Sequence, residues 1–439
     1  MSQLTQIEPE WIIPVEPSSQ VLTGHAVIIG EQRIVDVLDC ETAKLRYPSA
    51  TRLALPEHAL IPGLINAHSQ MGTTMLRGLS AKHTSPPAHL EQLTAQHLSE
   101  SLVYDSALLA CAEMLHGGIT TCSDSYYFPE ASARAALQCG MRLRLGVLVQ
   151  ATHSAYANDS QDYLARGMHL RDQLRDEPLL SFALALLAPQ ALSAASLAEI
   201  ATYAHELDLP IQAVLHETPE VIQLSLDAHG ERPWARLAAA GLCDPGLVTI
   251  HGVHLTEAEI FSMARCGASV VYCPSANLLL RRGDAPVATL HSAGVPIALG
   301  SDSAAFTQHL DLWQEMRLAA LLNASTTPSL AAQRALESAT LGGARALGQE
   351  ANLGSIHAGK YADLVAVDLS DSGSTPCYDP IHQLIYGGGR ERVRAVWVNG
   401  RQRLANGALI EIDELAIRAR TKQWQHKVQP LRFNPNNSI

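Results

Sequence analysis

The middle of the chain repeats one pattern, in which a short apolar run is followed by an Ala- and Leu-rich segment. Continuous apolar runs of this length are typical of buried parallel strands, and the segments between them have helical character. Two such helical segments cover residues 131–140 and 196–208. The apolar runs cover residues 59–68, 118–126, 141–150, 179–187, 209–217, 247–254, 268–274 and 295–303. Eight strand-then-helix units predict an α/β fold, a (β/α)8 barrel of the TIM type.

The two ends of the chain have a different pattern of apolar and polar residues. Residues 1–58 contain short alternating strands separated by turns, and a similar pattern returns at 353–412. We expect these two stretches to pair into a small β-sandwich beside a barrel formed by residues 59–352. The remaining segment, 413–439, includes "DELAIRARTKQWQHKV" and predicts a C-terminal helix followed by a tail.

Composition narrows the possible functions. The formal net charge is −12 with no basic cluster, which argues against nucleic acid or an anionic membrane surface as the main partner. The eight cysteines are scattered without a CxxC pair, as expected for free thiols in a reducing compartment. The start lacks the basic-then-apolar pattern of a signal peptide, and no apolar run has the length of a membrane span. We therefore expect a soluble cytoplasmic protein.

Polar residues gather where the predicted strands end. A packed barrel interior requires apolar side chains, so polar groups at several strand ends need a binding site or water to satisfy them. Barrel enzymes take their catalytic residues from the C-terminal ends of the strands, a region called here the barrel mouth. We expect the polar residues at these ends to converge there: His68, Gln70, His216, Glu217, His251, His254 and Asp302.

Several stretches carry a resemblance to a known family. They include "PGLINAH", "TMLRGLS", "LHETPEV", "IHGVHLTEAEI", "VVYCPSANLLL" and "GVPIALGSDSAA". With these motifs the chain resembles the amidohydrolase superfamily, and within it the methylthioadenosine/S-adenosylhomocysteine deaminase branch, which is related to the triazine hydrolases. The resemblance covers nearly the whole chain. It is specific for family membership and less specific for activity, because function depends on the site and not on the fold.

The resemblance implies a metal-dependent hydrolysis. In the family, one divalent ion (zinc, iron or manganese) activates a water molecule, and a glutamate moves protons. By this resemblance His68 and Asp302 are metal ligands, and Glu217, His251 and Asp302 are the catalytic residues. The expected substrate is a small heterocycle such as a purine nucleoside. A homodimer or larger homo-oligomer is also implied.

Two ligand positions depart from the family pattern. Gln70 replaces the second histidine of the HxH motif, and Val214 replaces the histidine three residues before the glutamate. An amide coordinates only through its carbonyl oxygen, and an isopropyl group cannot coordinate at all. Catalytic zinc usually has three protein ligands, so we expect no metal or a weakly bound one held by His68 and Asp302.

Residues that contact substrate in the family also differ. Leu187 replaces a histidine after the fourth strand, and Ala81–Lys82 replace an acidic pair. His216 lies two residues beyond Val214, so strand alternation would put both on the same face. We predict that His216 and Leu187 contribute to the substrate-binding wall.

Three interpretations of function remain open. The first is an active C–N hydrolase, a deaminase of an aminopurine nucleoside, with an altered metal site. The second is a metal-free descendant that binds a ligand without turnover, in a binding or regulatory role. The third is a metal-free lyase or isomerase that uses Glu217, His251 and Asp302 as acid and base.

Overall fold

The barrel predicted from the sequence is present. The computed structural model describes residues 4–17, 20–79, 86–323 and 327–428. Eight parallel strands lie in the order β13-β12-β11-β10-β9-β8-β7-β6. A parallel bridge between Ser69 and Asp302 joins the ends of the first and last strands. The strands are β6 (Leu64–Ser69), β7 (Ile119–Asp124), β8 (Arg142–Leu148), β9 (Leu180–Leu186), β10 (Ile211–Leu215), β11 (Leu247–His251), β12 (Ser269–Tyr272) and β13 (Ile297–Leu299).

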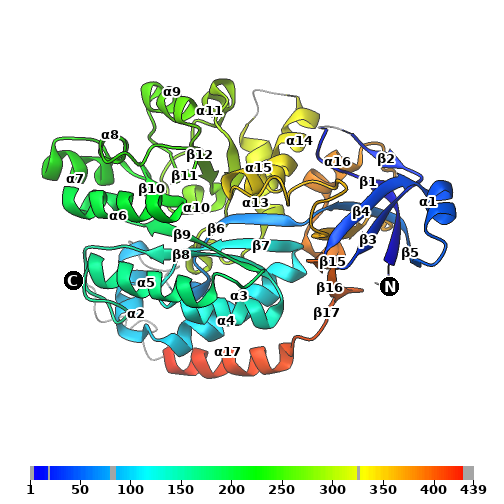
Figure 1. Ribbon diagram of the computed structural model, residues 1–439, viewed down its shortest axis with the longest axis horizontal. Coiled ribbons are helices and arrows are strands. Elements are labelled where there is room, and N and C mark those ends of the chain that lie inside the picture. Colours follow the sequence, from blue (N-terminus) through cyan, green and yellow to red (C-terminus); the bar gives the residue numbers. More distant parts are fainter. Residues whose placement is uncertain (1–3, 18–19, 80–85, 324–326, 429–439) are drawn as a thin grey trace.

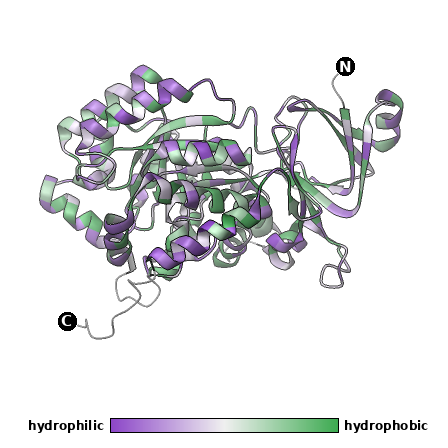
Figure 2. Ribbon diagram, turned by 90° about the horizontal axis from the view of Figure 1, so that it is seen from below, coloured by the Kyte–Doolittle hydropathy of each residue, from purple (hydrophilic) through white to green (hydrophobic). Residues whose placement is uncertain are grey.

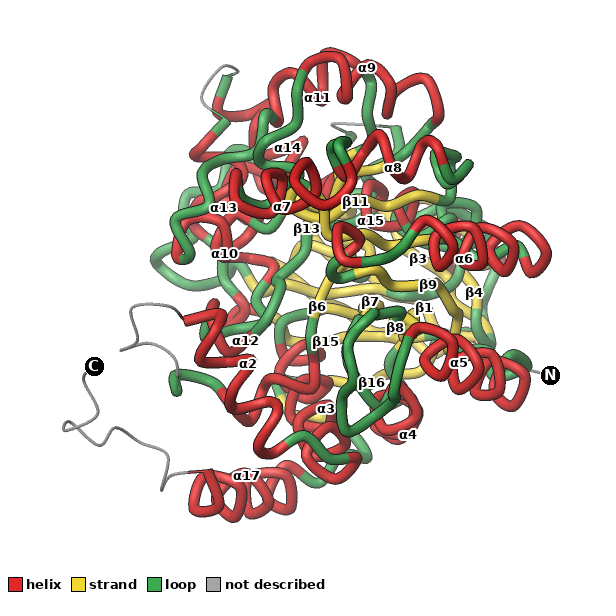
Figure 3. Tube along the Cα trace, turned by 90° about the vertical axis from the view of Figure 1, so that its left-hand side faces the viewer, coloured by secondary structure: helices red, strands yellow, loops and turns green. Residues whose placement is uncertain are grey.

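Helices surround the barrel, and this explains why its strands are buried on both faces. Every residue of β6, β7, β8 and β10–β13 is buried, as expected when helices cover a parallel sheet. Figure 3 shows the strands enclosed by helices, and Figure 2 shows outer helices with mixed hydrophilic and hydrophobic faces. The helices that follow or flank the barrel strands include α3 (Glu100–His116), α4 (Pro129–Cys139), α5 (Ser160–Leu174), α6 (Ala194–Leu207), α7 (Pro219–His229), α8 (Pro233–Ala239), α9 (Glu257–Cys266), α11 (Val287–Ala293), α13 (Leu312–Leu322), α14 (Pro328–Ser338) and α15 (Leu341–Ala346).

The two chain ends form a second sheet beside the barrel (Figure 1). Its strand order is β17-β16-β15-β14-β5-β1-β3-β4, with β2 pairing to β1. We call it the terminal sheet, and its presence confirms the predicted β-unit built from both ends. Its strands are β1 (Leu4–Ile12), β2 (Leu22–Thr23), β3 (His25–Gly30), β4 (Arg33–Asp39), β5 (Thr51–Pro62), β14 (Leu364–Asp368), β15 (Val393–Val398), β16 (Arg401–Ala405) and β17 (Ala408–Leu409).

A single glycine separates the terminal sheet from the barrel. Strand β5 continues in the terminal sheet as far as Pro62, which pairs with Leu364. The barrel begins directly afterwards, at Leu64. A Cβ on Gly63 would lie 2.1 Å from Thr120 Oγ1, so only glycine lets the chain pass this close to β7. The expected boundaries at 58/59 and 352/353 stay a prediction.

The C-terminal helix, α17 (Glu414–Val428), lies against α3. Trp424 Nε1 donates to Asp105 Oδ2 at 2.7 Å, and Arg420 Nη1 pairs with Asp105 Oδ1 at 2.8 Å. The tail expected at 429–439 lies outside the described residues. The remaining elements are α1 (Cys40–Arg46), α2 (Pro86–His97), α10 (Pro274–Leu279), α12 (Ala304–Thr307), α16 (Pro380–His382), η1 (Met71–Leu76), η2 (Pro189–Ala191), η3 (Gln383–Gly387) and η4 (Arg390–Arg392).

All eight cysteines are free, as their spacing predicted. Within the described ranges, none of the helices combines the length and the apolar character needed to cross a membrane.

Candidate functional site

Three strand-end residues at the barrel mouth take an unusual backbone conformation. His216, His251 and Asp302 have φ values of 52°, 69° and 55°. Side-chain-bearing residues rarely adopt this left-handed region, although Asp, Asn and His tolerate it best. The backbone therefore bends sharply where these strands end. Strained conformations of this kind cluster at functional sites.

His68 and Asp302 lie beside each other at the closure of the barrel. His68 is fully buried on β6, and its Nε2 lies 3.7 Å from Asp302 Oδ1. The backbone N–H of Asp302 donates to the carbonyl oxygen of His68 at 3.2 Å. Neither ring nitrogen of His68 has a hydrogen-bond partner within the described structure. Buried polar atoms without partners are rare, so the two ring nitrogens of His68 are exceptional within this site.

An arginine from a neighbouring loop occupies the centre of the site. Arg282 follows α10, and its Nη2 lies 2.7 Å from Glu217 Oε2. Its Nη1 lies 3.1 Å from His251 Nε2 and 3.3 Å from Asp302 Oδ2. The Arg282 side chain is only 11% exposed. One guanidinium therefore joins three of the four residues that the sequence predicted to act together.

The bonds of His251 define its protonation. Its Nε2 accepts a hydrogen bond from Arg282, so its Nδ1 carries the proton and donates to Asn277 Oδ1 at 2.9 Å. Burial and the neighbouring Arg282 lower the pKa of His251 to about 3. The imidazole is neutral at physiological pH. This tautomer leaves no lone pair free, because Arg282 already uses the one on Nε2.

The two carboxylates at the mouth differ in their pKa shifts. Burial raises the pKa of Glu217 above its usual range, although Arg282 acts in the opposite direction. Burial also acts to raise the pKa of Asp302. There, however, the neighbouring His68, His251 and Arg282 more than offset it and hold the pKa well below its usual range. Asp302 is therefore the permanently ionised group of the site.

Val214 and Gln70 stand at the two positions where the resemblance implies a metal-binding histidine. Val214 is 7% exposed and packs in an apolar cluster with Ala67, Ile250 and Ala298. Gln70 is half-buried and follows β6, where its backbone carbonyl oxygen accepts from the backbone N–H of Thr73 at 3.0 Å. Across the described residues, no group of three or more His, Cys, Asp or Glu side chains could hold a metal ion.

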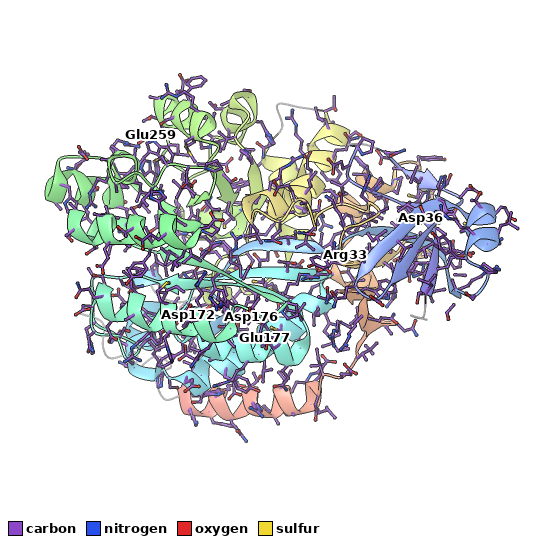
Figure 4. All side chains as sticks on the ribbon, in the orientation of Figure 1. Arg33, Asp36, Asp172, Asp176, Glu177 and Glu259 are labelled. Atoms are coloured by element: carbon purple, nitrogen blue, oxygen red, sulfur yellow. The ribbon has the colours of Figure 1, made fainter. Side chains whose placement is uncertain are left out.

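His216 differs from the sequence-based expectation. Its Nε2 accepts from the backbone N–H of Trp234 at 3.3 Å, and its Nδ1 lies 3.1 Å from Arg232 Nη2 and 3.5 Å from Glu259 Oε2. Figure 4 labels Glu259 on α9, outside the barrel strands. Strand alternation ends at Leu215, because the left-handed φ of His216 turns its side chain towards these partners. Both ring nitrogens are engaged. Its role in substrate binding stays a prediction.

Of the other residues expected to contact substrate, only Leu187 lies within the described structure. Leu187 follows β9 and packs against both the Val214 cluster and a second cluster containing Tyr156 and Tyr163. Its role also stays a prediction. Ala81 and Lys82 lie outside the described residues. His254, one of the strand-end residues expected at the mouth, donates through Nε2 to the carbonyl oxygen of Arg282 at 3.1 Å and helps to hold that loop.

Sequence reasoning missed two residues at the site. Arg282 was overlooked in "NLLLRRG", where a charged pair directly follows the motif after the seventh barrel strand. Asp124, at the end of β7, is 2% exposed and accepts from the backbone N–H of Met71 at 2.7 Å. It thereby fixes the turn just after Gln70. A polar residue at the end of the second barrel strand was the available signal for Asp124.

Comparison with known proteins agrees with the resemblance drawn from the motifs. The chain is 36% identical over 428 residues to a 5-methylthioadenosine/S-adenosylhomocysteine deaminase of Teredinibacter turnerae, covering 96% of this chain and 97% of that protein. Among solved structures, an adenosine deaminase from Xanthomonas campestris with bound zinc is 38% identical. It has a TM-score of 0.94 and covers 97% of this chain and 98% of that one.

A more distant structure supports the fold alone. Atrazine chlorohydrolase from Arthrobacter aurescens, complexed with zinc, is 22% identical with a TM-score of 0.88, and the match covers 96% of this chain and 99% of that one. The amidohydrolase family model matches residues 59–403. The protein thus belongs to the amidohydrolase family, and its resemblance to methylthioadenosine/S-adenosylhomocysteine deaminases is confirmed.

Proposed function

We propose that this protein binds a small nitrogen heterocycle of the aminopurine-nucleoside class at the barrel mouth, with impaired metal-dependent C–N hydrolysis. The deaminase names of its relatives support the ligand class. The packing of Val214 supports the second part, because an apolar cluster fills the place where the resemblance expects a metal-binding histidine. This packing is the observation that carries the proposal.

The donor set that remains does not fit a catalytic zinc ion. A catalytic zinc ion generally needs three protein ligands and an open position for water. His68 and Asp302 supply two, and the lone pair of His251 is already used by Arg282. Gln70 offers at best a carbonyl oxygen, which is a poor ligand beside imidazole. These donors leave the ligand set of a catalytic zinc ion incomplete.

The first experiment separates binding from turnover. Protein treated with a chelator is titrated calorimetrically with adenosine, methylthioadenosine and S-adenosylhomocysteine, and ammonia release is measured in parallel. We expect saturable binding by at least one of them, with turnover far below ordinary enzyme rates of about 1–1,000 per second. Turnover at ordinary enzyme rates that requires added zinc would contradict the proposal. A titration that shows no heat of binding for any of the three compounds would also contradict it.

A metal-free acid–base reaction is the second candidate function. One observation favours it: the Arg282 guanidinium contacts both the neutral His251 and Glu217, whose pKa is raised. Such a lyase or isomerase would turn over its substrate in the presence of chelator and lose activity on Glu217→Gln. Binding without any such turnover would leave the ligand-binding function as the better description.

We also propose, by family resemblance, that the protein is cytoplasmic and forms a homo-oligomer. Light scattering coupled to size-exclusion chromatography measures the oligomeric state directly. A mass equal to a single chain at micromolar concentration would contradict that part.

A further inference from the structure

We infer that Arg282 is the resident cation of this site and excludes divalent metal from it, an inference that rests on the proposed function. The guanidinium bonds to Glu217, His251 and Asp302 at 2.7, 3.1 and 3.3 Å. These are residues that the resemblance assigns to the metal and its water. An internal side chain thus supplies the positive charge that a metal ion supplies in the zinc-bound relatives.

The arginine is positioned by the fold. Its backbone N–H donates to the carbonyl oxygen of Asn277 at 2.9 Å, and its own carbonyl oxygen lies 3.1 Å from His254 Nε2. Asn277 in turn bonds the Nδ1 of His251 at 2.9 Å. The loop, the helix before it and the sixth barrel strand therefore form one connected network. A surface side chain that happened to fold inward would lack these anchors.

The charges at the mouth require such a cation. Glu217 and Asp302 are two carboxylates with side-chain exposures of 20% and 5%. Buried carboxylates are costly unless they are paired and hydrogen-bonded. A guanidinium satisfies both at once, because its planar donors can reach two acceptors in different directions. Unlike an exchangeable metal ion, this cation is part of the chain and cannot dissociate from the site.

The same contacts keep a metal out. Arg282 contacts one oxygen of Asp302, which the resemblance assigns to the metal, and it takes the lone pair of His251 Nε2, which would otherwise be free for the metal or its water. A divalent ion between His68 and Asp302 would also lie beside a fixed positive charge in a site shielded from water. Restoring the two lost imidazoles should therefore fail to restore metal binding while Arg282 remains.

Zinc titration of designed variants tests this inference. The variants are Gln70→His/Val214→His, the same pair with Arg282→Met, and the same pair with Arg282→Lys. Arg281→Met, combined with the same pair, is the matched control, because Arg281 is the adjacent arginine and is exposed. Zinc affinity is measured calorimetrically with zinc alone, and bound zinc is counted by elemental analysis after dialysis. Circular dichroism and thermal melting establish that each variant folds.

We expect the variant with Arg282→Met to bind zinc at least 100-fold more tightly than the histidine pair alone. The Arg282→Lys and Arg281→Met versions should bind as weakly as the histidine pair. If Arg282→Met does not fold, Arg282→Gln takes its place. Equal zinc affinity with and without Arg282 would overturn the inference, as would tight binding by the Arg282→Lys version. Failure of the proposed function would show in the heterocycle titration and in the ammonia-release assay, neither of which measures the zinc affinity of these variants.

Discussion

Arg142 Nε lies 2.9 Å from Asp363 Oδ2, across the junction between barrel strand β8 and the terminal sheet. The two side chains are 8% and 3% exposed, and Arg142 also stacks over the Tyr361 ring at 4.1 Å. Asp363 further accepts from the backbone N–H of Asn399 at 2.7 Å. A buried charge deprived of its partner is strongly destabilising. We predict that Asp363→Ala lowers the free energy of unfolding by about 3–5 kcal/mol, measured by urea denaturation.

An exposed pair provides the control for that prediction. Arg134 and Glu100 lie 2.7 Å apart, with side-chain exposures of 55% and 48%. Solvent screens such pairs, so Glu100→Ala should cost less than about 1 kcal/mol. If both substitutions have the same small effect, the junction does not depend on the buried ion pair.

The buried carboxyl group of Glu315 should make the stability of the protein depend on pH. Burial raises the pKa of this carboxyl from an ordinary value of 4.5 to about 8. Between these values the folded state binds more protons than the unfolded state, so the free energy of unfolding falls as pH rises. The slope from this group is on the order of 1 kcal/mol per pH unit.

Glu315→Gln removes this contribution. Glutamine stays neutral, and its amide oxygen can still accept from the backbone N–H of Ser275, which lies 3.0 Å from Glu315 Oε2. The variant should therefore gain stability relative to the native chain as pH rises from 5 towards 8. Urea denaturation at several pH values checks this, and parallel curves for the two proteins would contradict it.

We predict that the folded protein tolerates an apolar side chain in place of His68. Both ring nitrogens are buried without a hydrogen-bond partner in the described part of the chain, so His68→Leu removes no hydrogen bond. It removes only the 3.7 Å contact with Asp302, which keeps its ion pair with Arg282. We expect the free energy of unfolding to change by less than about 1 kcal/mol or to increase. The melting temperature of the native chain should also be unchanged by chelator. A chelator-induced fall that His68→Leu abolishes would instead indicate a bound metal.

Asn66 is the matched control on the same strand. It is also fully buried, but its amide donates to Ser301 Oγ at 2.7 Å and accepts from the Ser301 backbone at 3.0 Å. Asn66→Leu leaves these partners unpaired and should cost about 1–3 kcal/mol. Equal effects of the two leucine substitutions would contradict the unpaired state of His68.

We predict that the close packing of α5 against β8 requires glycine at position 167. A Cβ at this position of α5 would lie 2.0 Å from Val147 Cγ1 on β8. Alanine favours a helix by about 1 kcal/mol over glycine, but overpacking costs about 1–3 kcal/mol. We expect Gly167→Ala to be destabilising alone and to be tolerated once Val147→Ala has made room. Unfolding measurements on the double-mutant cycle test this, and additive effects would contradict it.

The sequence predicted the barrel and part of its site because both depend on local patterns. Each expected apolar run carries one barrel strand, and the resemblance placed Glu217, His251 and Asp302 at strand ends. Periodicity could not predict the orientation of His216, because one left-handed residue ends the alternation. It also could not find Arg282. That side chain reaches the site from a loop, and only the folded chain brings it against carboxylates from two other strands.

The strand order of the terminal sheet has a consequence for synthesis on the ribosome. Strand β5 pairs with β1 on one side and with β14 on the other, and the sheet then continues to β17. The strands from β1 to β5 can thus pair with one another early, whereas β5 gains its second neighbour, β14, only after the entire barrel has been made. Such long-range closure is slow and leaves a strand edge exposed while translation proceeds. We expect nascent chains truncated before Leu364 to present the open edge of β5, and to be bound by chaperones more than the full-length chain.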